Sequence, residues 1–126
     1  MRAVRLYGPR DLRLAEEADP VPGPGETLVR LDSMGICGSD LHWFLEGGIG
    51  ENRITDPLVP GHEMGGTVVA GPRTGERVAI EPGLPCSHCR YCVAGWVNLC
   101  PTCRFSGQGS VDGGFRGAIA EITVRS

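Results

Sequence analysis

The sequence contains no lysine: all twelve of its basic side chains are arginines, and they are scattered rather than grouped. Over 126 residues the net charge is −3, so the chain lacks the basic stripe with which proteins bind nucleic acid. No apolar run approaches the ~20 residues of a membrane span. The first residues also lack the apolar segment of a secretory signal peptide. We therefore expect a cytoplasmic protein without nucleic-acid or membrane partners.

Long helical patterns are missing as well, whereas glycine and proline are abundant. The chain has 20 glycines and 10 prolines, which is typical of many short strands joined by tight turns. Residues 39–45 are expected to form a single helical turn, with Ser39 or Asp40 as its cap. Strands are predicted mainly at residues 3–6, 12–15, 27–32, 67–70, 77–80 and 118–124. We thus predict one domain that is mainly β and folds as a compact barrel.

Four of the six cysteines are closely spaced, in the pattern Cys-x2-Cys-x2-Cys-x7-Cys. A two-residue gap lets two thiolates face one point at about 2.3 Å from a metal, and four thiolates complete a tetrahedral zinc site with no open position. Such a site holds a loop in shape and does no chemistry. The alternative is a disulfide framework, but reduced cytoplasmic thiols more often bind metal. The four residues are Cys86, Cys89, Cys92 and Cys100.

A second set of ligand-type residues lies upstream, with Cys37 in GICGSDLH and His62 and Glu63 in GHE. A thiolate, an imidazole and a carboxylate make a plausible catalytic zinc shell that leaves one position for water or substrate. The two anionic ligands would also balance the charge of Zn²⁺. On the residues alone, a buried cysteine and an unrelated surface His–Glu pair remain an alternative.

Three segments in this order and spacing resemble the N-terminal part of zinc-dependent medium-chain alcohol dehydrogenases: GICGSDLHWF, VPGHEMGGTV and RVAIEPGLPCSHCRYCVAGWVNLCP. Within that family the chain is most similar to the polyol branch of sorbitol, xylitol and L-idonate 5-dehydrogenases. The resemblance implies a GroES-like β-barrel over residues 1–126, with a cysteine-rich zinc-binding lobe at about residues 84–104. It also implies two zinc ions per chain, a catalytic one on Cys37, His62 and Glu63 and a structural one on Cys86, Cys89, Cys92 and Cys100.

The same resemblance implies roles for residues that follow Cys37. Ser39 matches the hydroxyl that takes the proton of the alcohol, and His42 matches the histidine at the solvent end of that relay. Asp40 matches a carboxylate that would orient a zinc ligand. Simpler interpretations remain open, because Ser39 and Asp40 also suit a helix cap and His42 suits a solvated surface. Three aromatic residues either line the substrate pocket or fill the core: Trp43, Phe44 and Phe105.

The reaction implied by the resemblance is oxidation of a secondary alcohol, such as a polyol or a sugar acid. The open zinc would lower the pKa of the bound alcohol to give an alkoxide, and NAD or NADP would accept the hydride. A coenzyme-binding Rossmann domain needs a G-x-G-x-x-G turn, which the sequence does not contain. We therefore expect that this domain is absent from the chain and that the chain alone binds zinc without turning over alcohol. The alternative function is a GroES-like zinc-binding structural or interaction module without oxidoreductase activity.

Overall fold

Short strands make up most of the ordered structure, in agreement with the predicted fold class. The computed structural model describes residues 1–108 and 122–125. Within these ranges the elements are β1 (Arg2–Gly8), β2 (Asp11–Glu16), β3 (Thr27–Gly35), α1 (Gly38–Glu46), β4 (Gly48–Ile49), β5 (Asn52–Arg53), β6 (Glu63–Ala70), β7 (Arg77–Ile80), β8 (Gly83–Leu84), α2 (Arg90–Val93), a 3-10 turn η1 (Val97–Leu99), β9 (Arg104–Phe105) and β10 (Ile122–Arg125). Of the strand expected at residues 118–124, residues 118–121 lie outside the described residues.

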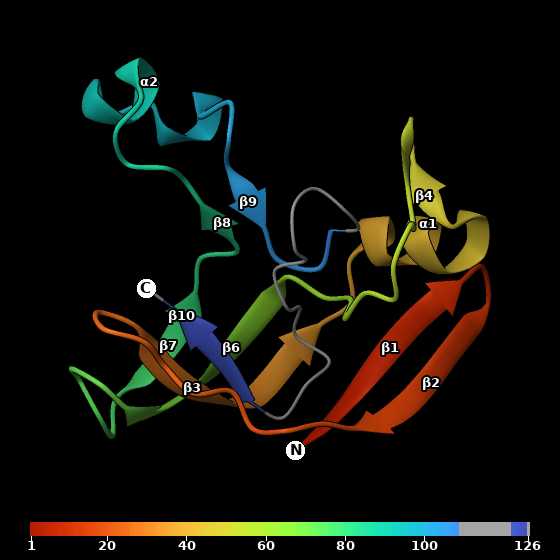
Figure 1. Cartoon of the computed structure of the whole chain (residues 1–126), viewed down its shortest axis with the longest axis horizontal. Helices are drawn as coiled ribbons and strands as arrows, with labels where there is room; N and C mark the ends of the chain where they lie inside the picture. The colour runs from red at the N-terminus through yellow and green to blue at the C-terminus, as the bar shows by residue number, and fades with distance from the viewer. Residues whose placement is uncertain (109–121, 126) are drawn as a thin grey trace.

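The central sheet is antiparallel and has the strand order β10-β3-β6-β7. The other described strands pair separately, as β1 with β2, β4 with β5 and β8 with β9. Figure 1 shows the β1–β2 hairpin beside this sheet and below α1, while the segment that carries α2 and η1 projects away from both. The described strands therefore form separate ribbons rather than one continuous hydrogen-bonded ladder, and the closed barrel expected from the sequence is not formed among them.

A small apolar core joins β1 to α1. Leu6 and Trp43 are 1% and 2% exposed, and both pack against the buried Leu58. The backbone reinforces this contact, because Leu6 and Leu58 exchange N–H···O hydrogen bonds of 2.8 and 3.1 Å. Burial of Trp43 anchors one face of the helix and so favours a full helix, Gly38–Glu46, where the sequence had indicated a single turn.

Helix α1 begins and ends at residues with clear local causes. Cys37 is its N-cap, and the carboxylate of Asp40 accepts a 2.9 Å hydrogen bond from the Cys37 N–H. Gly47 ends the helix in the left-handed conformation, with φ 70°. A Cβ at this position would come within 2.9 Å of Pro9 Cγ, so glycine also lets the hairpin turn approach the helix. The helix therefore fixes the position of its first turn, with Cys37, directly after the end of β3.

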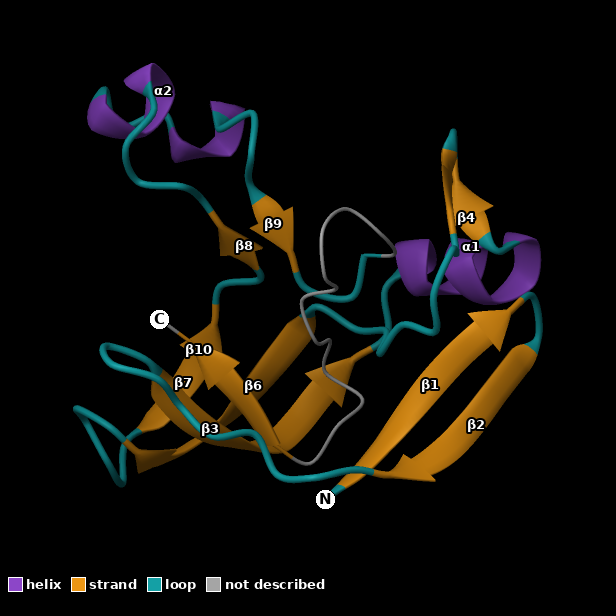
Figure 2. Ribbon diagram, in the orientation of Figure 1, coloured by secondary structure: helices purple, strands orange, loops and turns teal. Residues whose placement is uncertain are grey.

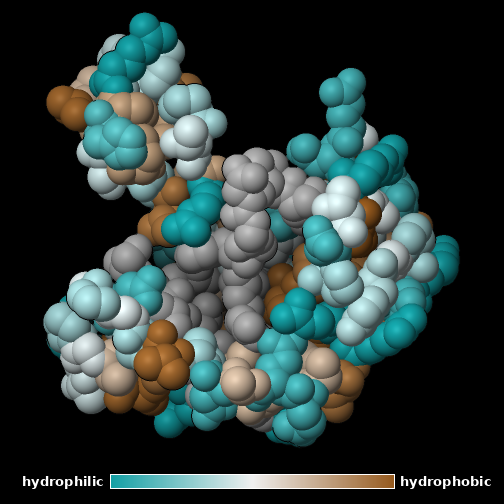
Figure 3. Space-filling model, in the orientation of Figure 1, coloured by the Kyte–Doolittle hydropathy of each residue, from teal (hydrophilic) through white to brown (hydrophobic). Residues whose placement is uncertain are grey.

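The segment around α2 and η1 forms a separate projection, which we call the cysteine lobe (residues 85–103). Figure 2 shows that it is joined to the rest of the molecule through the two-stranded ribbon of β8 and β9. The sequence indicated no regular structure here, and the structure adds only the short α2 and η1. Apolar surface is exposed on this lobe (Figure 3), contributed by Val93, Trp96, Val97 and Leu99.

Candidate metal centres

The four closely spaced cysteines converge within the cysteine lobe. Their sulfur atoms all lie within 4.8 Å of one another, with 3.9 Å between Cys86 and Cys92 and 3.5 Å between Cys89 and Cys92. A tetrahedron with Zn–S bonds of about 2.3 Å has S···S edges of about 3.8 Å. The four sulfurs, Cys86, Cys89, Cys92 and Cys100, therefore fit one zinc ion. All six cysteines of the chain are free thiols in the structure.

Backbone N–H groups of the lobe point at these sulfurs. The Cys89 N–H donates to Cys86 Sγ and the Cys86 N–H donates to Cys100 Sγ, both at 3.3 Å. The pKa of Cys86 is lowered to about 6, first by the N–H of His88 and further by that of Cys89. The N–H of Cys86 likewise lowers the pKa of Cys100. Donors aimed at thiolates are what a metal-binding sulfur cluster requires.

The pKa of Cys92 is shifted in the opposite direction. Desolvation raises its pKa to about 12, and the neighbouring Cys89 sulfur adds to the effect. Several thiolates at this spacing repel one another. A divalent cation between the four sulfurs would offset that repulsion, so their close spacing suits a metal site.

The second group contains Cys37, His62 and Glu63, whose ligand atoms also lie within 4.8 Å of one another. We call this group the trio. Cys37 comes from the start of α1 and Glu63 is the first residue of β6. The β3–β6 ladder sets Gly35 opposite Glu63, and a Cβ on Gly35 would lie 2.2 Å from Glu63 Oε2. Glycine at residue 35 therefore gives the Glu63 carboxylate room to turn toward Cys37.

The Cys37 thiol is prepared for ionisation. Its pKa is lowered, first by the N–H of Ser39, then by the Ser39 hydroxyl and by His62. Hydrogen bonds from the first turn of a helix stabilise a thiolate, which is the form that binds metal. The three donor types leave room for one further ligand in a tetrahedral shell, so the trio fits an open zinc site.

Asp40 connects the two segments that carry Cys37 and His62. Its Oδ2 accepts from the Cys37 N–H at 2.9 Å, and its Oδ1 accepts from the Gly61 N–H at 3.1 Å. The same Oδ1 lies 3.7 Å from His62 Nδ1, which leaves Nε2 of His62 as the nitrogen on the metal side. Only 8% of Asp40 is exposed. Its buried carboxylate thus orients two of the three ligand-bearing residues.

The structure places the two expected relay residues differently. Ser39 lies at the trio, with its Oγ 3.4 Å from His62 Nε2. His42 lies on the exposed side of α1, with Nδ1 2.7 Å from Glu46 Oε1. Because a carboxylate only accepts hydrogen bonds, His42 Nδ1 is the donor in this contact. The Glu46 contact had no signal in the sequence beyond the i, i+4 spacing.

The three aromatic residues separate into two groups. Trp43 is a core residue and Phe44 packs against the same core cluster. Phe105 instead lies against the trio, with its ring centroid 5.6 Å from that of His62.

Cys103, the sixth cysteine, is exposed and belongs neither to the cysteine cluster nor to the trio.

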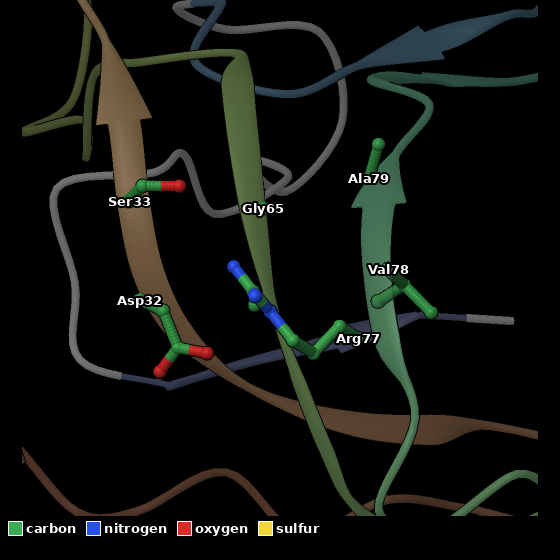
Figure 4. A pocket seen from close by; sticks show the side chains of 7 residues that line it. Asp32, Ser33, Gly65, Arg77, Val78 and Ala79 are labelled. Carbon is green, nitrogen blue, oxygen red and sulfur yellow. The ribbon is translucent and has the colours of Figure 1, made fainter.

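A hollow of about 300 Å³ lies elsewhere, on the central sheet. Figure 4 shows the Arg77 side chain reaching across Gly65 toward Asp32. The pKa of Asp32 is lowered, first by the hydrogen bond from Thr67 and further by the guanidinium groups of Arg30 and Arg77. Thr67 and Arg30 donate hydrogen bonds to the Asp32 carboxylate, and the hollow shares no residue with the cysteine cluster or the trio.

Comparison with known proteins places this geometry in a family. The family model for the alcohol dehydrogenase GroES-like domain matches residues 23–125. A sorbitol dehydrogenase of Macaca fascicularis is 45% identical over 114 residues, which are 86% of this chain and 32% of that protein. The chain therefore spans about a third of the length of this curated relative.

Solved structures give the same result. L-idonate 5-dehydrogenase from Escherichia coli superposes with a TM-score of 0.86 and 32% identity, over 98% of this chain and 36% of that one. A cobalt- and zinc-bound thermostable alcohol dehydrogenase from Pyrobaculum aerophilum superposes with a TM-score of 0.78 and 31% identity, over 98% and 38%. The expected GroES-like fold is thereby confirmed, and the chain belongs to the alcohol dehydrogenase GroES-like domain family.

Proposed function

We propose that the chain is the zinc-binding catalytic domain of an NAD- or NADP-dependent dehydrogenase that oxidises a secondary alcohol, such as a polyol or a sugar acid. The observation that carries the proposal is the convergence of Cys37, His62 and Glu63 at the start of α1 and β6. The similarity to a sorbitol dehydrogenase and to an L-idonate 5-dehydrogenase supports this class of substrate.

Two zinc ions per chain are part of the proposal. The cluster of Cys86, Cys89, Cys92 and Cys100 would hold a structural ion, since four thiolates leave no position for substrate. The trio would hold the catalytic ion. Zinc bound there would supply a Lewis acid that lowers the pKa of an alcohol in the open position.

The side chains around the trio would then position substrate and move its proton. Ser39 Oγ, which lies at the trio, would accept the proton of the alcohol as its own hydroxyl proton passes on toward solvent. His42, on the exposed side of α1, would pass a proton to solvent, a task for which imidazole is suited near neutral pH. Asp40 would keep Cys37 and His62 in place while this happens.

The coenzyme would be bound outside these residues. The sequence holds no G-x-G-x-x-G turn, so we propose that a separate Rossmann domain supplies NAD or NADP and that residues 1–126 alone do not turn over alcohol. We also propose a cytoplasmic location, because clustered cysteines that bind metal rather than form disulfides are typical of a reducing compartment. Among the described residues, no helix is long and apolar enough to cross a membrane.

Metal analysis of the purified chain tests the proposal. We expect two zinc ions, one for each cluster, of which Cys37→Ala removes one and Cys89→Ser removes the other. Cys103→Ser is the matched control and should keep both, because the exposed Cys103 lies outside the two clusters. A single zinc ion that survives Cys37→Ala would contradict a catalytic site and favour a structural zinc module.

A further inference from the structure

The segment that follows the cysteine lobe packs directly against Gly61 and His62. Phe105, at the end of β9, places its ring against the His62 imidazole at an interplanar angle of 53°. The next residue, Ser106, is fully buried at 0% exposure. Its Oγ donates to the Gly61 carbonyl at 3.5 Å, and its N–H donates to the Pro82 carbonyl at 3.0 Å. His62 is therefore supported from the side of the lobe as well as from Asp40.

Gly107 brings the two backbones closer still. A Cβ at Gly107 would lie 2.5 Å from the Gly61 carbonyl oxygen and 2.7 Å from the Gly61 nitrogen. That nitrogen carries the N–H that Asp40 accepts. Any side chain at residue 107 would thus displace Gly61 from Asp40 and shift the adjacent His62.

The same segment is tied to the sulfur cluster through the ribbon that supports the lobe. In this ribbon Gly83 pairs with Phe105 and Leu84 pairs with Arg104. Strand β8 ends two residues before Cys86, and the Cys103 N–H donates to the Cys100 carbonyl just before β9 begins. The cysteine lobe therefore joins the ends of the two paired strands, and β9 leads directly into residues 105–107.

We propose that metal binding in the cysteine lobe raises the metal affinity of the trio, with Phe105, Ser106 and Gly107 as the residues that transmit the effect. The proposal rests on the two zinc sites of the proposed function and adds a coupling between them. An ordered lobe holds residues 105–107 against Gly61 and His62, so the trio is arranged before its metal arrives. By linkage, metal at the trio strengthens metal binding in the lobe by the same factor.

Cobalt titration of the purified chain measures this coupling. Co²⁺ replaces zinc at both sites, and sulfur-to-cobalt charge transfer is stronger for four thiolates than for one, so the two sites are followed separately. We expect Cys89→Ser, which removes a lobe ligand, to weaken Co²⁺ binding at the trio by on the order of tenfold. We expect Gly107→Ala, which keeps all seven ligands, to weaken it by about 10- to 100-fold.

Gly75→Ala is the matched control. Gly75 also has a positive φ, 92° against 71° for Gly107, but a Cβ there has nothing within 4 Å. Both variants therefore place a side chain at a positive φ, and only Gly107→Ala brings a Cβ against Gly61. If Gly107→Ala unfolds by circular dichroism, Phe105→Leu decides instead, because it removes the ring contact with His62 and adds no steric clash.

The coupling would be overturned if the trio bound Co²⁺ as tightly as in wild type in two variants. These are Cys89→Ser and Gly107→Ala, or Phe105→Leu if Gly107→Ala unfolds. Equal weakening in Gly75→Ala would also overturn it, because the effect would then be general destabilisation. If the wild-type trio binds no cobalt while the lobe does, the proposed catalytic site fails, and the coupling fails with it.

Discussion

Replacing Asp40 with alanine should destabilise the chain more than the loss of most single carboxylates. Asp40 is buried, and its two oxygens accept hydrogen bonds from the N–H groups of Cys37 and Gly61. Alanine would leave both donors without this acceptor. Gly61 is buried, so water cannot replace the carboxylate there, whereas Cys37 is only half-buried and is partly rehydrated.

The magnitude follows from these two bonds. A hydrogen bond to a charged group contributes about 1.5–3 kcal/mol, and an unsatisfied buried donor costs a similar amount. With full loss at Gly61 and partial compensation at Cys37, Asp40→Ala should lower the free energy of unfolding by about 3–5 kcal/mol. Asp40→Asn should fall between wild type and alanine, because the amide keeps one accepting oxygen but turns an NH2 group toward the other N–H.

Urea unfolding of the metal-free chain, followed by the fluorescence of the buried Trp43, measures the change. Asp56→Ala is the control, since Asp56 is an exposed carboxylate that accepts from the Thr55 hydroxyl. It should change the stability by no more than about 0.5 kcal/mol. If Asp40→Ala matches Asp56→Ala, Asp40 does not hold the two ligand-bearing segments together and the reasoning fails.

Two further predictions concern the sheet and the lobe. Gly66→Ala should cost about 1–3 kcal/mol in urea unfolding, because its Cβ would meet the Arg30 carbonyl at 2.2 Å; Gly65→Ala, whose nearest neighbour is at 3.3 Å, should cost less, and equal costs would contradict the packing argument. The pKa of Cys86 in the folded chain, about 6, lies below its ordinary value of 9.0, so the unfolded chain binds more protons between these values. The stability due to Cys86 is therefore complete above about pH 9 and is lost as the pH falls through about 6. Unfolding of metal-free wild type and Cys86→Ser across this range should show a weaker pH dependence in the variant, and parallel curves would refute the assignment.

The β-rich fold and the sulfur cluster could be predicted because their signals are local. Strands near residues 27–32 and 77–80 follow from alternation and turn residues, and both are present as β3 and β7. The convergence of Cys86, Cys89, Cys92 and Cys100 follows from spacing, since all four lie within a segment of 15 residues. Helix α1 is longer than predicted because burial of Trp43 against Leu6 stabilises it, and that contact spans 37 positions of the sequence.

The trio could be proposed from a resemblance but not from spacing alone. Cys37 and Glu63 meet because β3 and β6 pair with a register that contains two irregularities, and the sequence alone does not indicate where such bulges occur. The contact of Gly107 with Gly61 had no sequence signal either, because a glycine in a turn and a glycine at a close backbone approach look alike. Only the folded chain distinguishes them.

The two candidate metal sites differ in what holds their side chains in place. The trio is supported by the apolar core. Cys37 is the N-cap of α1, the helix that Trp43 anchors in the core. His62 lies four residues after Leu58, whose backbone is hydrogen-bonded to Leu6 of β1. The lobe has no such support, since among its residues only Cys100 is buried and Trp96 is 61% exposed. A segment that buries so little apolar surface would gain most of its order from a bound metal. Under the proposed coupling, the order of the lobe would therefore change most with zinc, and the trio, which the lobe contacts through residues 105–107, would respond.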